Sequence, residues 1–114
     1  MGTFAIGDIV AIQFPYSDGK EGKKRPALVV RITEEKTLLV CMISATQRTD
    51  IQTFPIVGTD LVFSNLQRTS FVRPQALLEA DQGRCKKIGR LTGGLTNNIK
   101  SYLGEWIAGY ENPA

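Results

Sequence analysis

The chain has one segment with the periodicity of a long amphipathic helix, and that segment comes last. Its apolar residues recur at helical spacing and form one stripe: Leu95, Ile99, Leu103, Trp106 and Ile107. Everything before it is a succession of short apolar runs separated by glycine, proline and polar residues. A parallel sheet needs long crossover connections between its strands, and this chain has no room for them. The sequence therefore predicts an antiparallel sheet with one helix packed on it.

Several short runs have the length and composition of β-strands, and we expect five to seven strands. The runs cover residues 8–14, 25–32, 37–44, 53–57, 59–63, 69–74 and 86–91. Because proline disfavours continuation of a strand, we expect residues 75–81 to form one or two helical turns after Pro74. The prediction is a mainly β (α+β) chain, a small, strongly bent antiparallel barrel with a C-terminal α-helix, in a single domain over residues 1–114.

Composition excludes several kinds of site. The chain contains no histidine, which rules out imidazole metal ligands and histidine-dependent catalytic triads and dyads. Its two cysteines, Cys41 and Cys85, are far apart and lack metal-ligand spacing, and Cys41 lies in an apolar run and is expected in the core. Since the sequence carries no signal-peptide pattern and no apolar run of membrane-spanning length, we expect a soluble protein of the reducing cytoplasm.

Basic residues are concentrated in two short stretches. The first holds Lys20, Lys23, Lys24 and Arg25, and the second holds Arg84, Lys86, Lys87 and Arg90. The net charge is only +3, so these stretches indicate an uneven surface field rather than a uniformly basic protein. Such a field favours a polyanionic partner, and ordinary solvated loops are the alternative interpretation.

Three places along the chain are candidates for binding phosphate. Arg25 lies where a basic loop meets a strand, and a guanidinium on a fixed backbone can hold a phosphate through two parallel hydrogen bonds. Ser44 and Thr46 follow the third strand, where hydroxyls can bind a phosphate or a ribose 2′-OH. Arg73 precedes the proline that we expect to end a later strand. The alternatives are an ion pair at a strand end for the arginines and turn capping for the hydroxyls.

Five short motifs, in this order, resemble the PemK/MazF-like toxins of bacterial toxin–antitoxin pairs. They are GDIVAIQFPYSDG at residues 7–19, KKRPALVV at 23–30, VCMISATQ at 40–47, SFVRPQALL at 70–78 and KKIGRLT at 86–92. The resemblance covers most of the chain. It implies an SH3-like barrel, a homodimer, and a partner antitoxin that blocks the active groove.

The resemblance also implies an activity. Most members of that family are endoribonucleases that cleave single-stranded RNA at preferred short sequences and need no metal ion or other cofactor. The catalytic residues that it implies here are Arg25, Ser44 and Thr46. The candidate RNA-binding residues are Tyr16, Ser17, Lys20, Lys23, Lys24, Arg73 and Gln75. The ribose 2′-OH would be the nucleophile, and Arg25 would stabilise the charge that develops on the phosphate.

One position departs from the family pattern and keeps other functions open. Gln75 stands where many members carry an acidic residue, and an amide accepts no proton near neutral pH. The departure supports a first alternative, a non-catalytic barrel that binds RNA or DNA. A second alternative is a toxin that acts on a protein, as the gyrase poisons of the same fold do, which requires an exposed C-terminal aromatic residue. Trp106 is instead expected in the core. A third is an interaction module only.

Overall fold

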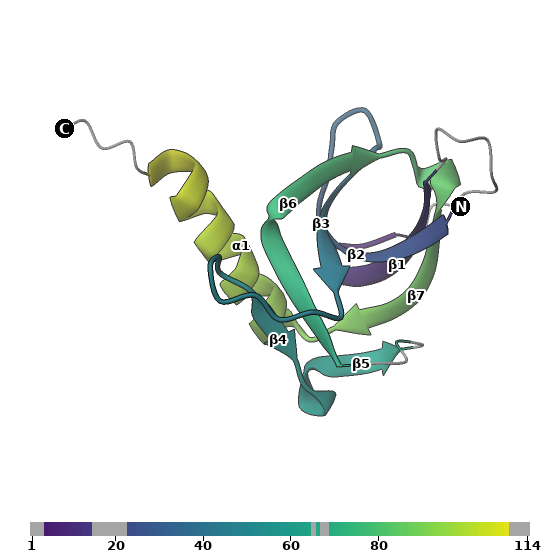
Figure 1. The fold of residues 1–114 in the computed structure, drawn as a ribbon. Coiled ribbons are helices and arrows are strands. Elements are labelled where there is room, and N and C mark those ends of the chain that lie inside the picture. Colours follow the sequence, from purple (N-terminus) through teal and green to yellow (C-terminus); the bar gives the residue numbers. More distant parts are fainter. Residues whose placement is uncertain (1–3, 15–22, 65, 67–68, 110–114) are drawn as a thin grey trace.

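Seven antiparallel strands and one α-helix make up the described part of the chain in the computed structural model, residues 4–14, 23–64, 66 and 69–109 (Figure 1). The strands are β1 (Asp8–Phe14), β2 (Lys23–Ile32), β3 (Leu38–Ser44), β4 (Phe54–Ile56), β5 (Leu61–Ser64), β6 (Ser70–Ala80) and β7 (Cys85–Leu91). The helix is α1 (Gly93–Gly109), and short 3-10 turns, η1 (Gly58–Asp60) and η2 (Gln82–Arg84), precede β5 and β7. This helix is not long and apolar enough to cross a membrane.

The strands form one sheet that curls into a nearly closed barrel. Their order is β4-β6-β3-β2-β1-β7-β5, and every neighbouring pair is antiparallel. Figure 1 shows the ring of strands, with α1 beside it. The predicted antiparallel barrel with a C-terminal helix is therefore confirmed.

Strand β6 is longer than the sequence predicts. We expected the strand to end at Pro74 and residues 75–81 to form helical turns, and this was wrong, because Ser70–Ala80 is a single strand. Its pairing with β3 shifts register between Val72 and Leu77, and Pro74 lies in that irregular stretch. A strand accepts proline at such a bulge, since the ladder does not use the missing N–H there.

Both faces of the sheet are buried, in two separate hydrophobic clusters. The inner cluster, inside the ring of strands, consists of Val10, Ile12, Ala27, Val29, Leu38, Val40 and Ala80. The outer cluster includes the helix residues Ile99 and Leu103 and packs them against the sheet. Its strand residues are Ile9, Leu28, Val30, Cys41, Ile43, Ile56, Val72 and Leu91. Strands β1, β2 and β3 contribute to both clusters, so their backbones are fixed from two sides.

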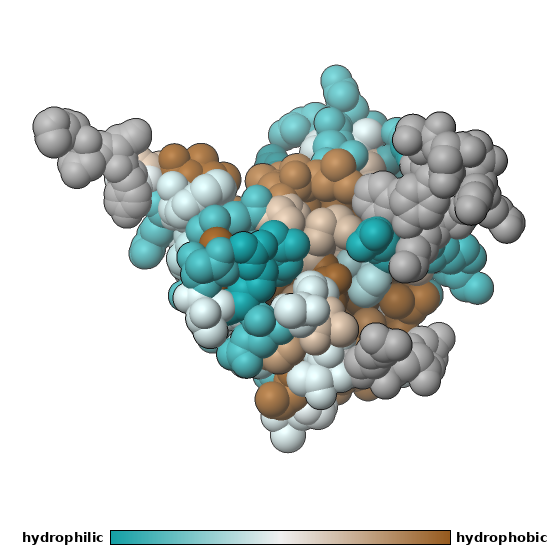
Figure 2. All heavy atoms as spheres, in the orientation of Figure 1, coloured by the Kyte–Doolittle hydropathy of each residue, from teal (hydrophilic) through white to brown (hydrophobic). Residues whose placement is uncertain are grey.

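The helix does not bury the whole of its apolar stripe. Ile99 and Leu103 are buried, but Trp106 is 42% exposed and Ile107 is 63% exposed. The expectation that Trp106 lies in the core was therefore wrong. The physical reason is visible in Figure 1, where the C-terminal end of α1 diverges from the barrel and has no strand beneath it. Figure 2 shows hydrophobic side chains on the surface at that end of the helix.

A buried carboxylate joins the start of β1 to β7. Asp8 is fully buried, and its Oδ1 accepts a hydrogen bond from Arg90 Nε at 2.9 Å. Its Oδ2 lies 3.2 Å from Lys87 Nζ and accepts the Ala5 backbone N–H at 2.8 Å. A buried charge is tolerated only when it is paired and hydrogen-bonded. Two residues of the second basic stretch, Lys87 and Arg90, thus neutralise a carboxylate of the fold.

The Asp8 cluster predicts a stability change. We expect Asp8→Asn to lower the free energy of unfolding by about 2 kcal/mol, less than for a fully buried pair because Arg90 and Lys87 reach solvent in part. Urea denaturation measures this loss as a lower midpoint urea concentration, with an unchanged slope of the unfolding free energy against urea concentration. The matched control is Asp50→Asn, which removes an exposed ion pair with Arg48 and is expected to leave the midpoint in place. Equal midpoints for the two variants would contradict the role assigned to Asp8.

The two thiols predict different reactivity. Burial raises the pKa of the Cys41 thiol to about 12. The Cys85 thiol is only half-buried, and burial is the main cause that raises its pKa too. Because the thiolate is the reactive form, a raised pKa lowers the reaction rate at pH 8, most strongly for Cys41. Iodoacetamide should therefore modify Cys85 before Cys41 in the native protein, and both alike in urea, as read by peptide mass spectrometry. Faster native labelling of Cys41 would show that β3 is not packed as described.

Candidate functional site

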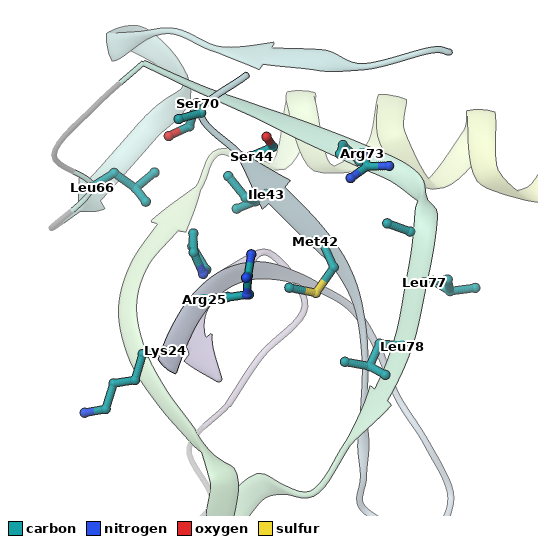
Figure 3. Close-up of a pocket in the computed structure, with 13 residues that line it drawn as sticks. Lys24, Arg25, Met42, Ile43, Ser44, Leu66, Ser70, Arg73, Leu77 and Leu78 are labelled. Atoms are coloured by element: carbon teal, nitrogen blue, oxygen red, sulfur yellow. The ribbon is translucent and has the colours of Figure 1, made fainter. Parts of the chain in front are cut away.

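A hollow of about 730 Å³ opens at the mouth of the barrel, between the start of β2, the end of β3 and the bulged part of β6 (Figure 3). Its lining residues are Lys24, Arg25, Pro26, Met42, Ile43, Ser44, Ala45, Leu66, Ser70, Arg73, Ala76, Leu77 and Leu78. They combine cations, hydroxyls and apolar side chains, and none of these lining residues is a carboxylate. The hollow is therefore suited to an anion that also carries apolar surface.

Arg25 continues the inner row of β2 out to the mouth of the barrel. It pairs with Ile12 of β1, and the next residues of its row are Ala27 and Val29, which belong to the inner cluster. Its side chain extends into the ring of strands, while that of Lys24 points away from it (Figure 3). Arg25 is exposed and makes no hydrogen bond or ion pair with the residues that the structure describes. A guanidinium with a fixed backbone and no carboxylate partner is free to bind an anion.

Pro26, the residue after Arg25, lies before the point at which β2 begins to pair with β3. Pro26 pairs with Ala11 of β1, but the ladder with β3 starts at Ala27, opposite Met42. A proline is accepted at such a strand opening because it has no N–H to donate. The gap in the ladder leaves room for the hollow between the ends of β2 and β3.

Ser44 and Thr46 are positioned differently from each other. Ser44 ends β3 and lines the hollow, and its Oγ accepts the Thr46 backbone N–H at 3.0 Å. This bond is a turn cap, but the Ser44 hydroxyl keeps its own hydrogen to donate. Thr46 is exposed and does not line the hollow.

Arg73 comes from the bulge of β6 and lines the opposite side of the hollow from β2. Its Nε is buried and has no hydrogen-bond partner in the described part of the chain. A buried donor without a partner costs free energy that a bound anion can recover. The hydrogen bond from Arg48 is the main cause that lowers the pKa of the Asp50 carboxyl, and the charge of Arg73 makes a small further contribution.

Gln75 lies outside the hollow. Its Nε2 donates to the Tyr102 hydroxyl at 2.9 Å, which links β6 to α1. The Tyr102 ring in turn packs edge-on against Phe54 of β4, with 5.8 Å between ring centroids. In this arrangement Gln75 supports the contact between sheet and helix rather than facing the lining residues.

The remaining candidates are only partly covered by the structure. Tyr16, Ser17 and Lys20 lie outside the described residues, and Lys23 begins β2 opposite Phe14. The sequence interpretation missed Ser70, which opens β6 and lines the hollow. Its signal was a hydroxyl at a strand start, but only the pairing of β3 with β6 brings it near Ser44.

The donors of the hollow are guanidinium, ammonium and hydroxyl groups. Among the described residues there is no group of three or more acidic, cysteine or histidine side chains that could hold a metal ion. The hollow therefore has guanidinium and hydroxyl donors, a lysine at its edge, and apolar walls from Met42, Leu77 and Leu78. Such donors can bind and polarise a phosphodiester.

The chain is similar to known toxins in sequence pattern and in fold. A family model described as PemK-like, MazF-like toxin of type II toxin-antitoxin system matches residues 5–107. A search of curated proteins found no match. The fold is similar to that in the crystal structure of MazE-MazF (Form-II) from Deinococcus radiodurans, with a TM-score of 0.67, 14% sequence identity, and coverage of 91% of this chain and 94% of that chain. The chain therefore belongs to the PemK-like, MazF-like toxin family of type II toxin–antitoxin systems.

Proposed function

We propose that this toxin is a metal-independent endoribonuclease that cleaves single-stranded RNA in the hollow beside Arg25. The observation that carries the proposal is an exposed guanidinium, without a carboxylate partner among the described residues, at the mouth of a rigid barrel. Family membership supports the same activity. RNA supplies its own nucleophile, so the protein needs only to position the strand and stabilise charge.

In the proposed reaction the 2′-oxygen forms a bond to phosphorus and the bond to the 5′-oxygen breaks. The proton of the 2′-OH passes to solvent water, and the departing 5′-oxygen takes up a proton from the solvent. Arg25 donates two hydrogen bonds to the phosphate as its negative charge increases, and Ser44 orients the phosphate or the 2′-OH. The guanidinium of Arg73, which lines the other side of the hollow, is the second donor. The products are a 2′,3′-cyclic phosphate, which a water molecule can open to a 3′-phosphate, and a 5′-hydroxyl.

The apolar walls suit the bases of the same strand. Met42, Leu77 and Leu78 line the hollow next to the cations, and Met42 and Leu78 point into the ring of strands (Figure 3). Bases of a single strand need apolar surface when they leave their stack. We assign the phosphate to the arginines and a neighbouring base to these walls.

We also propose that the chain acts as a homodimer in the cytoplasm and is inhibited by an antitoxin. The similar crystal structure holds MazE together with MazF, which supports an antitoxin as partner. The exposed end of α1, with Trp106 and Ile107, offers apolar surface for such assembly.

The exposure of Trp106 favours one second candidate, a toxin that acts on a protein in the manner of a gyrase poison. The two functions predict different damage in cells that express the toxin: cleaved RNA for the endoribonuclease, and an impaired protein with intact RNA for the second candidate. Growth arrest with intact RNA, abolished by Trp106→Ala, would favour the second candidate. Growth arrest with new 5′-hydroxyl RNA ends favours RNA cleavage.

Removing the proposed charge-stabilising group is the principal test of the function. We expect Arg25→Ala to lower the cleavage rate of a labelled RNA mixture about 10²–10³-fold, as for loss of one donor to a developing oxyanion. Arg25→Lys should recover only part of the rate, since lysine lacks the planar fork. The matched control is Arg31→Ala, which removes another exposed arginine of β2 that pairs with Glu34. Full cleavage by folded Arg25→Ala would contradict the proposal.

The position of Gln75 predicts that its substitution affects the stability of the protein more than the cleavage of RNA. We expect Gln75→Ala to lower the free energy of unfolding by about 1 kcal/mol, because the Tyr102 hydroxyl loses its partner. We expect cleavage to fall far less than in Arg25→Ala, since Gln75 does not line the hollow. Thermal unfolding and RNA cleavage of the same samples measure both. A loss of cleavage as large as that of Arg25→Ala, without a loss of stability, would indicate that Gln75 acts directly in the RNA site.

A further inference from the structure

A second, smaller hollow of about 340 Å³ adjoins the first on β1, β2 and β7. It is lined by Ala11, Gln13, Lys24, Gly83, Arg84, Cys85 and Lys86. Lys24 also lines the first hollow, so one side chain borders both. None of the described residues that line the second hollow is a carboxylate, and three of them are cations.

Strand register explains why four of these residues, Ala11, Gln13, Lys24 and Lys86, share one face. Gln13 of β1 pairs with Lys24 of β2, and Ala11 of β1 pairs with Lys86 of β7. Directly opposed residues of an antiparallel pair point to the same side, and so do residues two apart on one strand. Arg84 completes the set from the turn η2, where its Nη2 donates to the Gln13 carbonyl at 3.3 Å. That bond lays the guanidinium across β1.

The second basic stretch thus divides into two pairs with different partners. Lys87 and Arg90 are neutralised by the buried Asp8. Arg84 and Lys86 form no ion pair with the residues that the structure describes. Unpaired cations around a concave surface create a positive potential that attracts an anionic ligand.

We propose that this second hollow binds the phosphodiester backbone of the RNA nucleotides that adjoin those in the first hollow. This proposal rests on the proposed function. The RNA strand would run from Arg25 past Lys24 to Arg84. Arg84 uses one N–H for Gln13 and keeps the others for a phosphate, and Lys86 adds a point charge. None of the described residues that line the hollow is aromatic, so these residues contribute affinity without selecting bases.

The test compares oligonucleotides of two lengths. Oligoribonucleotides of about four and about ten mixed-sequence nucleotides, 2′-O-methylated to prevent cleavage, are titrated by fluorescence anisotropy over a series of salt concentrations. We expect Arg84→Ala/Lys86→Ala to reduce the preference for the longer oligonucleotide about 10-fold. The slope of log affinity against log salt should fall by about 1.4, the value for two phosphate contacts of a single strand. Arg84→Gln/Lys86→Gln provides a second variant if the first fails to fold.

A variant with the same loss of charge elsewhere serves as the control. Arg31→Ala/Lys100→Ala removes two cations that line neither hollow, and it should keep the length preference of the wild type. An equal loss in this control would reduce the effect to net charge and overturn the proposal. An unchanged length preference in the Arg84/Lys86 variant, while Arg25→Ala abolishes cleavage, would overturn it and leave the proposed function standing. A wild type that neither binds nor cleaves RNA would overturn both.

Discussion

Strand β2 is hydrogen-bonded to β1 on one edge and to β3 on the other, and it is buried on both faces. This double constraint begins at Ala27, and Arg25, two residues earlier on the same strand, is held by the ladder with β1. The inner row of β2 is apolar until it reaches the mouth of the barrel, where the next side chain is a guanidinium. A cation held in this way needs little reorganisation when negative charge develops beside it, which is the condition for electrostatic stabilisation of a transition state. The hollow, the proposed RNA path and the proposed chemistry all depend on that placement.

The basic residues of this protein have two separate uses, which their clustering in sequence does not reveal. One pair holds the buried Asp8 and stabilises the fold. Five others, Lys24, Arg25, Arg73, Arg84 and Lys86, line two adjoining hollows that share Lys24, and none of the described lining residues is a carboxylate. Because several cations and no described carboxylate line these hollows, a net charge of +3 understates the positive potential at the mouth of the barrel.

Local patterns predicted much of the fold, and non-local pairing decided the rest. Alternation and strand length located β1 and β3, and helical spacing located α1, because these signals lie within the segments themselves. The strand through Pro74 was not predictable, since its bulge depends on the register with β3. The exposure of Trp106 depends on where the barrel ends beneath the helix. In the site, Arg25 was identified from its strand position, but Ser70 becomes a neighbour only through strand pairing.

The most direct measurement is the structure of this protein bound to an RNA that carries a single 2′-deoxy nucleotide at its cleavage position, which removes the nucleophile and keeps the phosphate. The account predicts the scissile phosphate in the 730 Å³ hollow, with two guanidinium nitrogens of Arg25 at about 2.8 Å from its non-bridging oxygens. A scissile phosphate bound elsewhere, with Arg25 directed to solvent, would contradict it.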